Sequence, residues 1–454
     1  MKKLFFLFTL ALFLACMPPN GQTITINWTT PLQIIDGFGA ASAAVVPPLT
    51  SAQMNFLYTT SGIGLDFIRL QIYPNSVDCA DDITASNCVT VSSGATLGND
   101  DLANARAAYA RGARVWATEW SPPDAMKSSG SFLGGGSMIG NSTNYTTLAS
   151  IQAGFVTLLT GTYGIPVYAI SVQNEPNVSR NYASCTWTAQ QFHDYVPYLY
   201  SALSTAGYPP STKIMISEAS SWKNSYDATA MADSSVAPDI GILAEHGYRS
   251  SASLLTWSNF ATQWVWETEV SDFNTYDGSM TSALTYATQI YQWLTKAQVN
   301  AWNYWLLTGQ AWGGTKGFSD NEALTDVNGN VAMRAYALGN WAKFVRPGWH
   351  MVSVTNSTGL LVTAFADSLN HNAAIVVVNT SGSAVTNQAI SVGTAMGSSV
   401  VPWVTSSSLS LAAQSSVSVS SGSFTYTFPA DSVVTFQGQS LGGAKARLQG
   451  HQGV

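Results

Sequence analysis

The chain has 454 residues, enough for one large barrel and a smaller second domain. Only 9% of the residues are charged, the formal net charge is −7, and no basic cluster precedes the C-terminal tail, so nucleic acid is not an expected partner. The 15 Trp and 19 Tyr are more informative, because flat aromatic rings with polar edges suit the faces and hydroxyl groups of sugars.

The N-terminus has the pattern of a secretory signal peptide, which we expect to span residues 1–22. Met1-Lys2-Lys3 form a short basic head, and the apolar run that follows ends at residue 15, too short for a membrane span. We therefore expect secretion to the extracellular space or the periplasm and no membrane-spanning segment. Lipoprotein anchoring at Cys16 is the weaker alternative, since the residues before it match that cleavage box poorly.

Eight short apolar runs, rich in β-branched and aromatic residues, recur between residues 34 and 346 and predict buried strands. Helical patterns such as 101–111, 146–160 and 188–206 separate several of them, and this alternation indicates a parallel sheet. Eight strands without a phosphate-type Gly loop favour a (β/α)8 barrel over a doubly wound sheet. The runs are 34–40, 66–72, 113–118, 168–172, 213–217, 239–244, 263–268 and 299–306.

Beyond the barrel, residues 347–437 consist of short alternating segments separated by turns, which predicts an antiparallel β-sandwich side domain. We expect the N-terminal strand at 23–33 to join this side domain, and the very short link Arg346-Pro347-Gly348 to pack the two domains together. The polar, Gly-rich segment 438–454 is expected to be a disordered tail.

The four cysteines and five histidines predict a disulfide but no metal centre. Cys79 and Cys88 lie nine positions apart in a polar, turn-rich segment, which predicts a disulfide in an oxidising compartment. Cys185 is then free or buried. Since no Cys/His cluster has metal-ligand spacing, we expect no metal and no cofactor.

The run that begins at Tyr168 ends abruptly in Gln-Asn-Glu-Pro, where Pro176 stops the strand. Asn174 and Glu175 therefore lie at the carboxyl end of a parallel strand, where the chemistry of α/β barrels takes place. A carboxylate there suits acid or base work, and the amide beside it suits a substrate hydroxyl. The alternative is a helix N-cap region, which also gathers Asn and Glu.

Glu269 is the second candidate carboxylate, because glycoside hydrolysis needs two that flank one bond. It follows an aromatic and β-branched run that also contains Glu267, two positions back on the same face. Glu269 lies 94 positions after Glu175, close to three barrel units of roughly 30 residues each. The two carboxylates are therefore expected to end strands four and seven and to face each other across the barrel mouth.

Five short patches together resemble glycoside hydrolase family 30, which belongs to a clan of retaining barrel hydrolases. The resemblance runs from about residue 23 to residue 437 and implies a (β/α)8 barrel with a β-sandwich built from the C-terminal segment and an N-terminal strand. The patches are Asp36-Gly37-Phe38-Gly39, Trp120-Ser121-Pro122-Pro123-Asp124-Ala125-Met126-Lys127, residues 171–176, Trp266-Glu267-Thr268-Glu269, and Phe344-Val345-Arg346-Pro347-Gly348.

The resemblance implies that Glu175 is the acid/base, protonated at rest, and that Glu269 is an ionised nucleophile. Arg69, at the end of strand two, is expected to orient Glu269, although a structural ion pair is the alternative. Asn174 is expected to bind a sugar 2-hydroxyl.

The remaining candidates also follow predicted strands. His246 and Tyr248 come after strand six, and the resemblance places Tyr248 beside the nucleophile, with a packing role as the alternative. Trp120 and Trp305 are expected to be sugar platforms, although a single Trp is more often core. Four further residues are not expected to act on the substrate: Glu119 and Glu218 are strand-end carboxylates without a role, Glu267 is structural, and His193 is a surface residue.

The strand-four patch and the segment at residues 185–188 are most similar to the xylan-cleaving branch of the family, so an endo-β-1,4-xylanase acting as a monomer is expected. That branch often recognises a glucuronic acid branch through an Arg after strand eight, and residues 304–312 contain no Arg. Dependence on the acidic branch is therefore not expected. The alternatives are a β-1,6-glucanase, a β-1,6-galactanase or a glucosylceramidase-like hydrolase, and, in a different class, a non-catalytic carbohydrate-binding protein.

Overall fold

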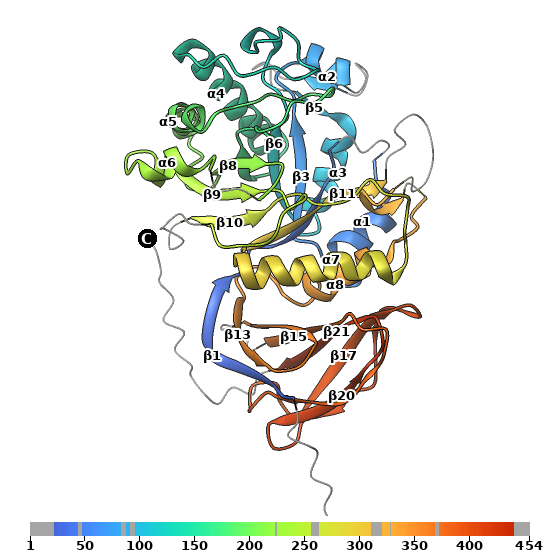
Figure 1. The fold of residues 1–454 in the computed structure, drawn as a ribbon. Helices are drawn as coiled ribbons and strands as arrows, with labels where there is room; N and C mark the ends of the chain where they lie inside the picture. Colours follow the sequence, from blue (N-terminus) through green and yellow to red (C-terminus); the bar gives the residue numbers. More distant parts are fainter. Residues whose placement is uncertain are drawn as a thin grey trace, which may run out of the picture.

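A computed structural model describes residues 22–43, 48–82, 88–90, 96–222, 225–255, 263–309, 320–326, 328–367 and 372–439. The predicted signal peptide before residue 22, with Cys16, and the tail from residue 440 lie outside these ranges. Figure 1 shows two stacked parts, a barrel of strands and helices and a separate sheet in orange and red, with helices α7 and α8 between them.

Eight parallel strands form the barrel, and β10 pairs with both β9 and β11, which closes the ring. Each predicted barrel strand is present, with ends shifted by a few residues, and the (β/α)8 prediction is confirmed. A further short strand, β12 (Ala323–Asp326), pairs with β11 outside the ring. The ring consists of β2 (Gly37–Ala41), β3 (Phe67–Ile72), β6 (Arg114–Glu119), β7 (Val167–Ser171), β8 (Lys213–Ala219), β9 (Ile240–Glu245), β10 (Trp264–Glu267) and β11 (Ala301–Gly309).

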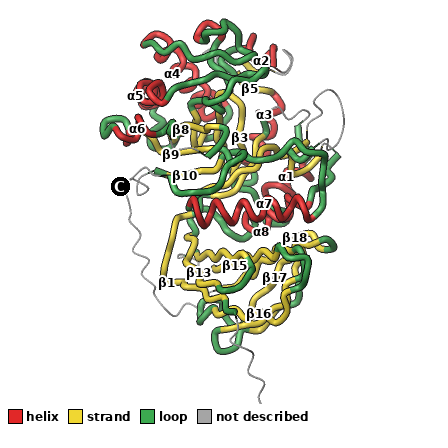
Figure 2. Tube along the Cα trace, in the orientation of Figure 1, coloured by secondary structure: helices red, strands yellow, loops and turns green. Residues whose placement is uncertain are grey.

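Helices follow most of the barrel strands and cover the outside of the ring (Figure 2). Local sequence fixes where they begin: at α5, Thr188 and Gln191 form a capping box in which each side chain accepts from the other's backbone N–H. The helices are α1 (Ser51–Tyr58), α2 (Ser76–Asp82), α3 (Asn99–Tyr109), α4 (Ser142–Thr157), α5 (Ala189–Thr205), α6 (Ala228–Ala232), α7 (Met280–Gln292) and α8 (Met333–Ala342).

Between α2 and α3, the short strands β4 (Cys88–Thr90) and β5 (Thr96–Gly98) pair antiparallel. The predicted disulfide between Cys79 and Cys88 is confirmed, and it ties α2 to β4. Cys185 is free and buried.

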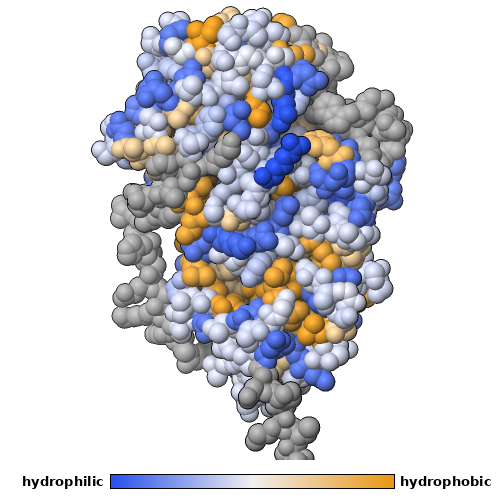
Figure 3. Space-filling model, in the orientation of Figure 1, coloured by the Kyte–Doolittle hydropathy of each residue, from blue (hydrophilic) through white to orange (hydrophobic). Residues whose placement is uncertain are grey.

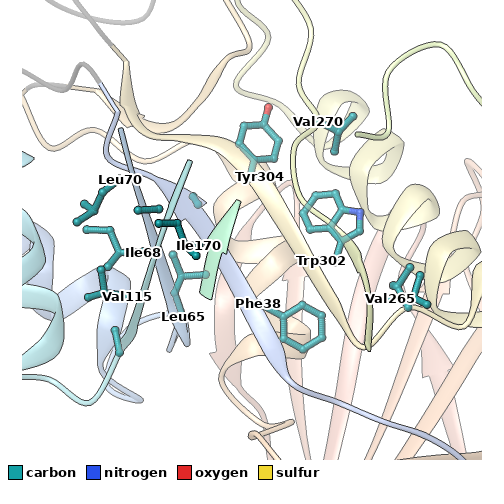
Figure 4. Packing of buried hydrophobic residues seen from close by; sticks show 14 of the residues in the cluster. Phe38, Leu65, Ile68, Leu70, Val115, Ile170, Val265, Val270, Trp302 and Tyr304 are labelled. Carbon is teal, nitrogen blue, oxygen red and sulfur yellow. The ribbon is translucent and has the colours of Figure 1, made fainter. Parts of the chain in front are cut away.

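The barrel has two apolar regions separated by its own strands. Outside the ring, strand residues such as Ile68 and Val115 pack with the surrounding helices (Figure 4). Inside the ring, Phe67, Trp116 and Trp266 fill the interior, with Trp266 centroids 4.6 Å from Phe67 and 5.9 Å from Trp116. Because side chains alternate along a strand, the residues two positions further on also face the interior, one layer nearer the mouth.

The side domain is a mainly antiparallel sheet in which β1 lies between β13 and β16. Its pairing with β16 is parallel, which is the exception to the predicted antiparallel pattern. An apolar cluster that includes Ile375, Val434 and Phe436 fills its interior. The strands are β1 (Ile24–Ile34), β13 (His350–Asn356), β14 (Leu361–Ala366), β15 (Asn372–Asn379), β16 (Val385–Ser391), β17 (Ser399–Ser406), β18 (Leu409–Ala413), β19 (Val417–Ser418), β20 (Ser423–Phe428) and β21 (Ser432–Gln439).

Helix α8 joins the barrel to the side sheet through a buried polar contact. The side-chain amide of Asn340 donates to Trp403 O at 3.1 Å and to Thr435 Oγ1 at 2.9 Å, and its Oδ1 accepts from Thr405 Oγ1 at 2.6 Å. Trp341 Nε1 donates to Thr363 Oγ1 at 3.1 Å. The two parts are therefore held together by satisfied hydrogen bonds as well as by apolar packing.

None of the helices in the described ranges is long and apolar enough to cross a bilayer. On the face drawn in Figure 3, hydrophobic residues occur in small groups among hydrophilic ones.

Candidate active site

Four charged side chains meet at the carboxyl end of the barrel. Arg69 lies on β3, two positions after the interior Phe67, and His246 directly follows β9. Glu175 lies four residues beyond β7, and Glu269 lies two residues beyond β10. The four residues are buried, with Glu175 5% and Glu269 6% exposed. One of these residues lies at an interior-facing position of its strand and the others follow strand ends, so the barrel brings together residues that are far apart in sequence.

Arg69 is the centre of the hydrogen-bond network. Its Nη1 donates to Glu269 Oε2, and its Nη2 donates to Asn174 Oδ1 at 2.7 Å and pairs with Glu218 Oε1 at 3.1 Å. Its Nε donates to Thr118 Oγ1 at 3.2 Å. The predicted contact of Arg69 with Glu269 is present, and the same guanidinium also holds Asn174.

Glu269 is held from two sides. Arg69 contacts Oε2, and the hydroxyl of Tyr248 donates to Oε1 at 2.9 Å. Tyr248 therefore lies beside Glu269, where the resemblance placed it. Glu267 does not compete for this position, because its carboxylate accepts from the backbone N–H of Gly247 at 3.0 Å and of Glu269 at 3.1 Å.

Glu175 has a different environment on the opposite side of His246. Its Oε2 accepts from the hydroxyl of Tyr182 at 3.0 Å and lies 3.8 Å from Arg180 Nε, while its Oε1 lies 3.6 Å from His246 Nδ1. The backbone of Glu175 is left-handed, with φ 44°, and its N–H donates to Glu218 O at 2.9 Å. Such a conformation is costly for a non-glycine residue and is typical of functional sites.

His246 carries the proton of this cluster. Burial by itself lowers the pKa of His246, but the carboxylates of Glu269, Glu175 and Glu218 outweigh it and raise this pKa to about 10. Its Nε2 lies 3.7 Å from both Glu218 Oε1 and Glu269 Oε2. His246 is therefore an imidazolium at neutral pH.

The pKa of Glu175 is lowered, contrary to the prediction of a protonated acid at rest. Burial raises the pKa of this carboxyl, but the nearby cation of His246, with the Tyr182 hydroxyl and Arg180, outweighs burial. Glu218 behaves similarly: burial raises its pKa, and Arg69 and His246 lower it further than burial raises it. The prediction considered only the charge of Glu269 and left out the protonated His246.

The same geometry limits what else the site can bind. One ligand atom each from Glu175, His246 and Glu269 lie within 4.8 Å of one another, so these three residues could hold a metal ion. An imidazolium has no free lone pair, however, and Arg69 already contacts Glu269. The arrangement fits an ionised carboxylate beside a proton-carrying pair better than a metal centre.

Two predicted aromatic residues flank the charged cluster. Trp120 and Trp305 lie with ring centroids 6.1 Å apart, and the Arg69 guanidinium is 4.4 Å from the Trp120 ring and 5.6 Å from that of Trp305. Trp120 is 6% exposed, whereas Trp305 is partly buried. Cation–π contact therefore fixes both rings at the wall of the site.

Three site residues were missed from the sequence. Glu218 was set aside, yet it pairs with Arg69 and lies beside His246; its place at the end of β8 was the signal available. Tyr182 and Arg180 lie in the loop after β7, and no pattern in that loop distinguishes them. Glu119 and His193 do lie away from the cluster: Glu119 accepts from Gln152 Nε2 at 2.6 Å, and His193 contacts Asp194 and Asp233 at the surface.

Comparison with known proteins gives relatives along nearly the whole chain. No family model matches the chain. Glucuronoxylanase XynC from Bacillus subtilis (strain 168) is 26% identical over 423 residues, which is 91% of each chain. The glycoside hydrolase family 30 subfamily 8 xylanase Xyn30A from Clostridium acetobutylicum is 29% identical with a TM-score of 0.78, covering 92% of this chain and 99% of the other.

Two further solved structures show how far the likeness extends. A family 30 endoxylanase from Clostridium papyrosolvens C71 is 28% identical with a TM-score of 0.75, covering 92% of this chain and 100% of the other. The endo-β1,6-glucanase BT3312 is 19% identical with a TM-score of 0.69, covering 92% and 94%, and shares the fold. The barrel with its side sheet and the relatives that match it from end to end show that the chain is a glycoside hydrolase similar to the xylanases of family 30.

Proposed function

We propose that this protein is a secreted, monomeric endo-β-1,4-xylanase that retains configuration, with Glu269 as nucleophile and Glu175 as acid/base. The carrying observation is the separation of these carboxylates: an oxygen of one lies within 4.8 Å of an oxygen of the other. Retaining glycosidases place the two groups about 5–5.5 Å apart, whereas inverting enzymes leave about 6.5–9.5 Å for a water molecule.

Glu269 has the surroundings that a nucleophile needs. Arg69 and the Tyr248 hydroxyl both contact its carboxylate and hold it in place for attack. In the first step Glu269 attacks the anomeric carbon, a C–O ester bond forms and the glycosidic C–O bond breaks. The leaving oxygen takes a proton from Glu175 as that bond breaks.

His246 supplies the proton that Glu175 lacks at rest. Imidazolium with carboxylate and imidazole with carboxylic acid hold the same number of protons, so His246 Nδ1 can pass its proton over 3.6 Å to Glu175 Oε1. Glu175 is then protonated without taking up a proton from solvent. In the second step Glu175 takes a proton from water, and that water opens the ester and frees Glu269.

The other buried groups bind the sugar that reacts. Asn174, fixed by Arg69, lies next to Glu175 and is placed to hold the 2-hydroxyl, where contacts strengthen at the transition state. Trp120 and Trp305 provide apolar wall for a sugar ring.

Xylan is the favoured polymer because the relatives that span the chain are named as xylanases. One of them is named a glucuronoxylanase. Residues 304–312 of this chain contain no Arg, so we propose that an acidic branch is not required for cleavage. The endo-β1,6-glucanase with the same fold makes β-1,6-glucan the alternative polymer.

The test is a panel of linear xylan, arabinoxylan, glucuronoxylan, β-1,6-glucan, β-1,6-galactan and glucosylceramide, with products followed by NMR. We expect all three xylans to be cut at similar rates, internal bonds to break first, and the first-formed product to be the β-anomer. Cleavage of β-1,6-glucan alone would move the assignment to the alternative. Binding without any product would indicate a non-catalytic protein, and an α-anomer would overturn retention.

A further inference from the structure

Arg180 and Tyr182 form an exposed pair beside Glu175 that the reaction itself does not use. The Arg180 side chain is 47% exposed, and Tyr182 is 41% exposed. Each faces Glu175 Oε2, Tyr182 through its hydroxyl at 3.0 Å and Arg180 through Nε at 3.8 Å. Among the residues that the structure describes, no hydrogen bond engages the terminal nitrogens of Arg180. A half-exposed guanidinium with a free fork is suited to a carboxylate.

The backbone, not the ion pair, holds these two residues in place. The loop that carries them is joined to the loop after β6: Gly134 N donates to Tyr182 O at 3.1 Å, and Leu133 bridges Ala183. Arg180 N donates to Ser184 Oγ at 3.0 Å. Arg180 can therefore exchange its distant contact with Glu175 for a ligand without unfolding the loop.

The position of the pair defines which part of a substrate it meets. Glu175 must lie against the oxygen of the leaving group, so residues that contact Glu175 Oε2 lie close to the leaving group. An aromatic ring and a cation are thus presented to the sugar that departs.

The net charge of the buried cluster makes Arg180 important for an acidic ligand. Glu175, Glu218 and Glu269 face two cations, Arg69 and the protonated His246, which leaves one negative charge. That charge by itself repels a carboxylate, and Arg180 neutralises it at the rim.

We propose that Arg180 and Tyr182 form a leaving-group subsite that takes a xylose unit bearing a carboxylate branch, with Arg180 binding the carboxylate and Tyr182 contacting the sugar ring. The inference rests on the proposed xylanase activity and adds the position at which an acidic branch on the substrate is bound. Cleavage then occurs on the non-reducing side of a branched xylose, and the branch is carried by the leaving fragment.

The test compares Arg180→Gln and Arg180→Lys with wild type on glucuronoxylan, neutral linear xylan and a nitrophenyl β-xylobioside. A nitrophenyl leaving group carries no sugar into the subsite and needs little protonation. We expect Arg180→Gln to lower kcat/KM for glucuronoxylan about fivefold more than it lowers kcat/KM for neutral xylan or for the nitrophenyl substrate, the size of a partly exposed charge pair. Arg180→Lys should recover part of the loss, because it keeps the charge but not the fork.

Product structure gives the second readout. We expect the acidic oligosaccharides released by wild type to carry the branch on the xylose at their non-reducing end, and Arg180→Gln to reduce this class of product. A branch carried on the other side of the cleaved bond would overturn the proposal. An unchanged ratio of acidic to neutral rates in Arg180→Gln would do the same.

Two controls separate this inference from its basis. Lys316→Gln removes the lysine that the sequence places between the described ranges ending at 309 and beginning at 320. A lower ratio of the glucuronoxylan rate to the neutral xylan rate in Lys316→Gln, with no change of this ratio in Arg180→Gln, would assign the role to Lys316. Arg106→Gln alters a guanidinium that lies over Tyr163, away from the site, and should change neither rate. If wild type cuts neutral xylan and both Arg180 variants have the wild-type ratio of acidic to neutral rates, this inference fails and the proposed activity stands. If wild type cuts no xylan, the proposed activity itself fails.

Discussion

At the scale of single residues, the charge state of the site depends on two buried cations. Arg69 reaches Glu269, Glu218 and Asn174 with one guanidinium, a geometry that an ammonium cannot reproduce. His246 lies between the carboxylates and holds the proton that the acid needs. The two carboxylates are thus given different roles by their neighbours, not by their own chemistry.

The first prediction separates those roles. Glu269→Ala should reduce turnover on every glycoside by at least about 10³-fold, because no glycosyl ester can form. Glu175→Ala should still be glycosylated by substrates with good leaving groups and should accumulate the ester. Azide should then rescue Glu175→Ala with retained configuration and give the inverted glycosyl azide with Glu269→Ala, as followed by NMR. Near-normal activity in Glu269→Ala would move the nucleophile to Glu267.

The second prediction concerns pH. Apart from burial, which raises it, the nearby His246 cation has the largest effect on the pKa of Glu175, and it lowers this pKa. In wild type the proton that Glu175 needs leaves the pair only with the pKa of His246, about 10. In His246→Gln Glu175 must hold that proton alone, so the alkaline limb of the kcat/KM profile should move to lower pH while kcat falls about 10- to 100-fold. His193→Gln, at a surface histidine, is the matched control and should leave the profile unchanged. An alkaline limb that stays in place or moves to higher pH in His246→Gln would contradict the proton-sharing pair.

At the scale of elements, a buried carboxylate ties the barrel wall to its helices. Glu119, the last residue of β6, accepts from Gln152 on α4, and Gln152 Oε1 accepts from Tyr195 on α5 at 2.9 Å. Gln152 also donates to Val172 O at 3.1 Å, next to β7. This contact fixes the strand end from which Asn174 and Glu175 follow, since Asn174 N donates to Glu119 O at 2.8 Å.

Glu119 predicts a pH-dependent stability. Burial raises the pKa of Glu119 from 4.5 to about 8, so the folded state keeps a proton that the unfolded state loses. Its contribution is fully present below pH 4.5 and is lost as the pH rises through 8. Glu119→Gln should therefore be more stable than wild type at pH 9 by a few kcal/mol and about equal at pH 4, as measured by urea unfolding. Asp124→Asn, an exposed control, should show no such crossover, and a constant difference across pH would rule out the protonated carboxyl.

At the scale of the whole molecule, the side sheet is built from both ends of the chain. β1 lies between strands of the C-terminal segment, and the chain then enters the barrel at β2. Helix α8 closes the barrel and packs on β17 and β21 through Asn340. Because the barrel and the sheet share this helix and these strands, we expect them to unfold together.

Asn340→Ala tests that coupling. The substitution removes the three side-chain hydrogen bonds that Asn340 makes with Trp403 O, Thr405 Oγ1 and Thr435 Oγ1, and should cost about 2–3 kcal/mol. We expect one unfolding transition in wild type and in the variant, shifted to lower urea in the variant, when fluorescence and circular dichroism are compared. Asn328→Ala, at an exposed position, should shift the midpoint little. Two separate transitions in wild type would show that the side sheet folds by itself.

The sequence by itself determined the fold, the disulfide and the place of the main candidates. Strand composition and the alternation with helices are local properties, so they predicted all eight barrel strands and the antiparallel side domain. Since chemistry in such a barrel gathers where strands end, Glu175 and Glu269 followed from Pro176 and from strand order. The signal peptide and the tail stay predictions, because they lie outside the described residues.

Only the tertiary structure decided how the charged groups share protons and partners. Glu218 looked like Glu119, since both end strands, but one lies against Arg69 and the other against Gln152. The depressed pKa of Glu175 and the charge of His246 depend on distances of 3.6–3.7 Å between residues that belong to or follow different strands. Such distances are set by closure of the ring, which brings together side chains far apart in sequence, so no local pattern in the chain contains them.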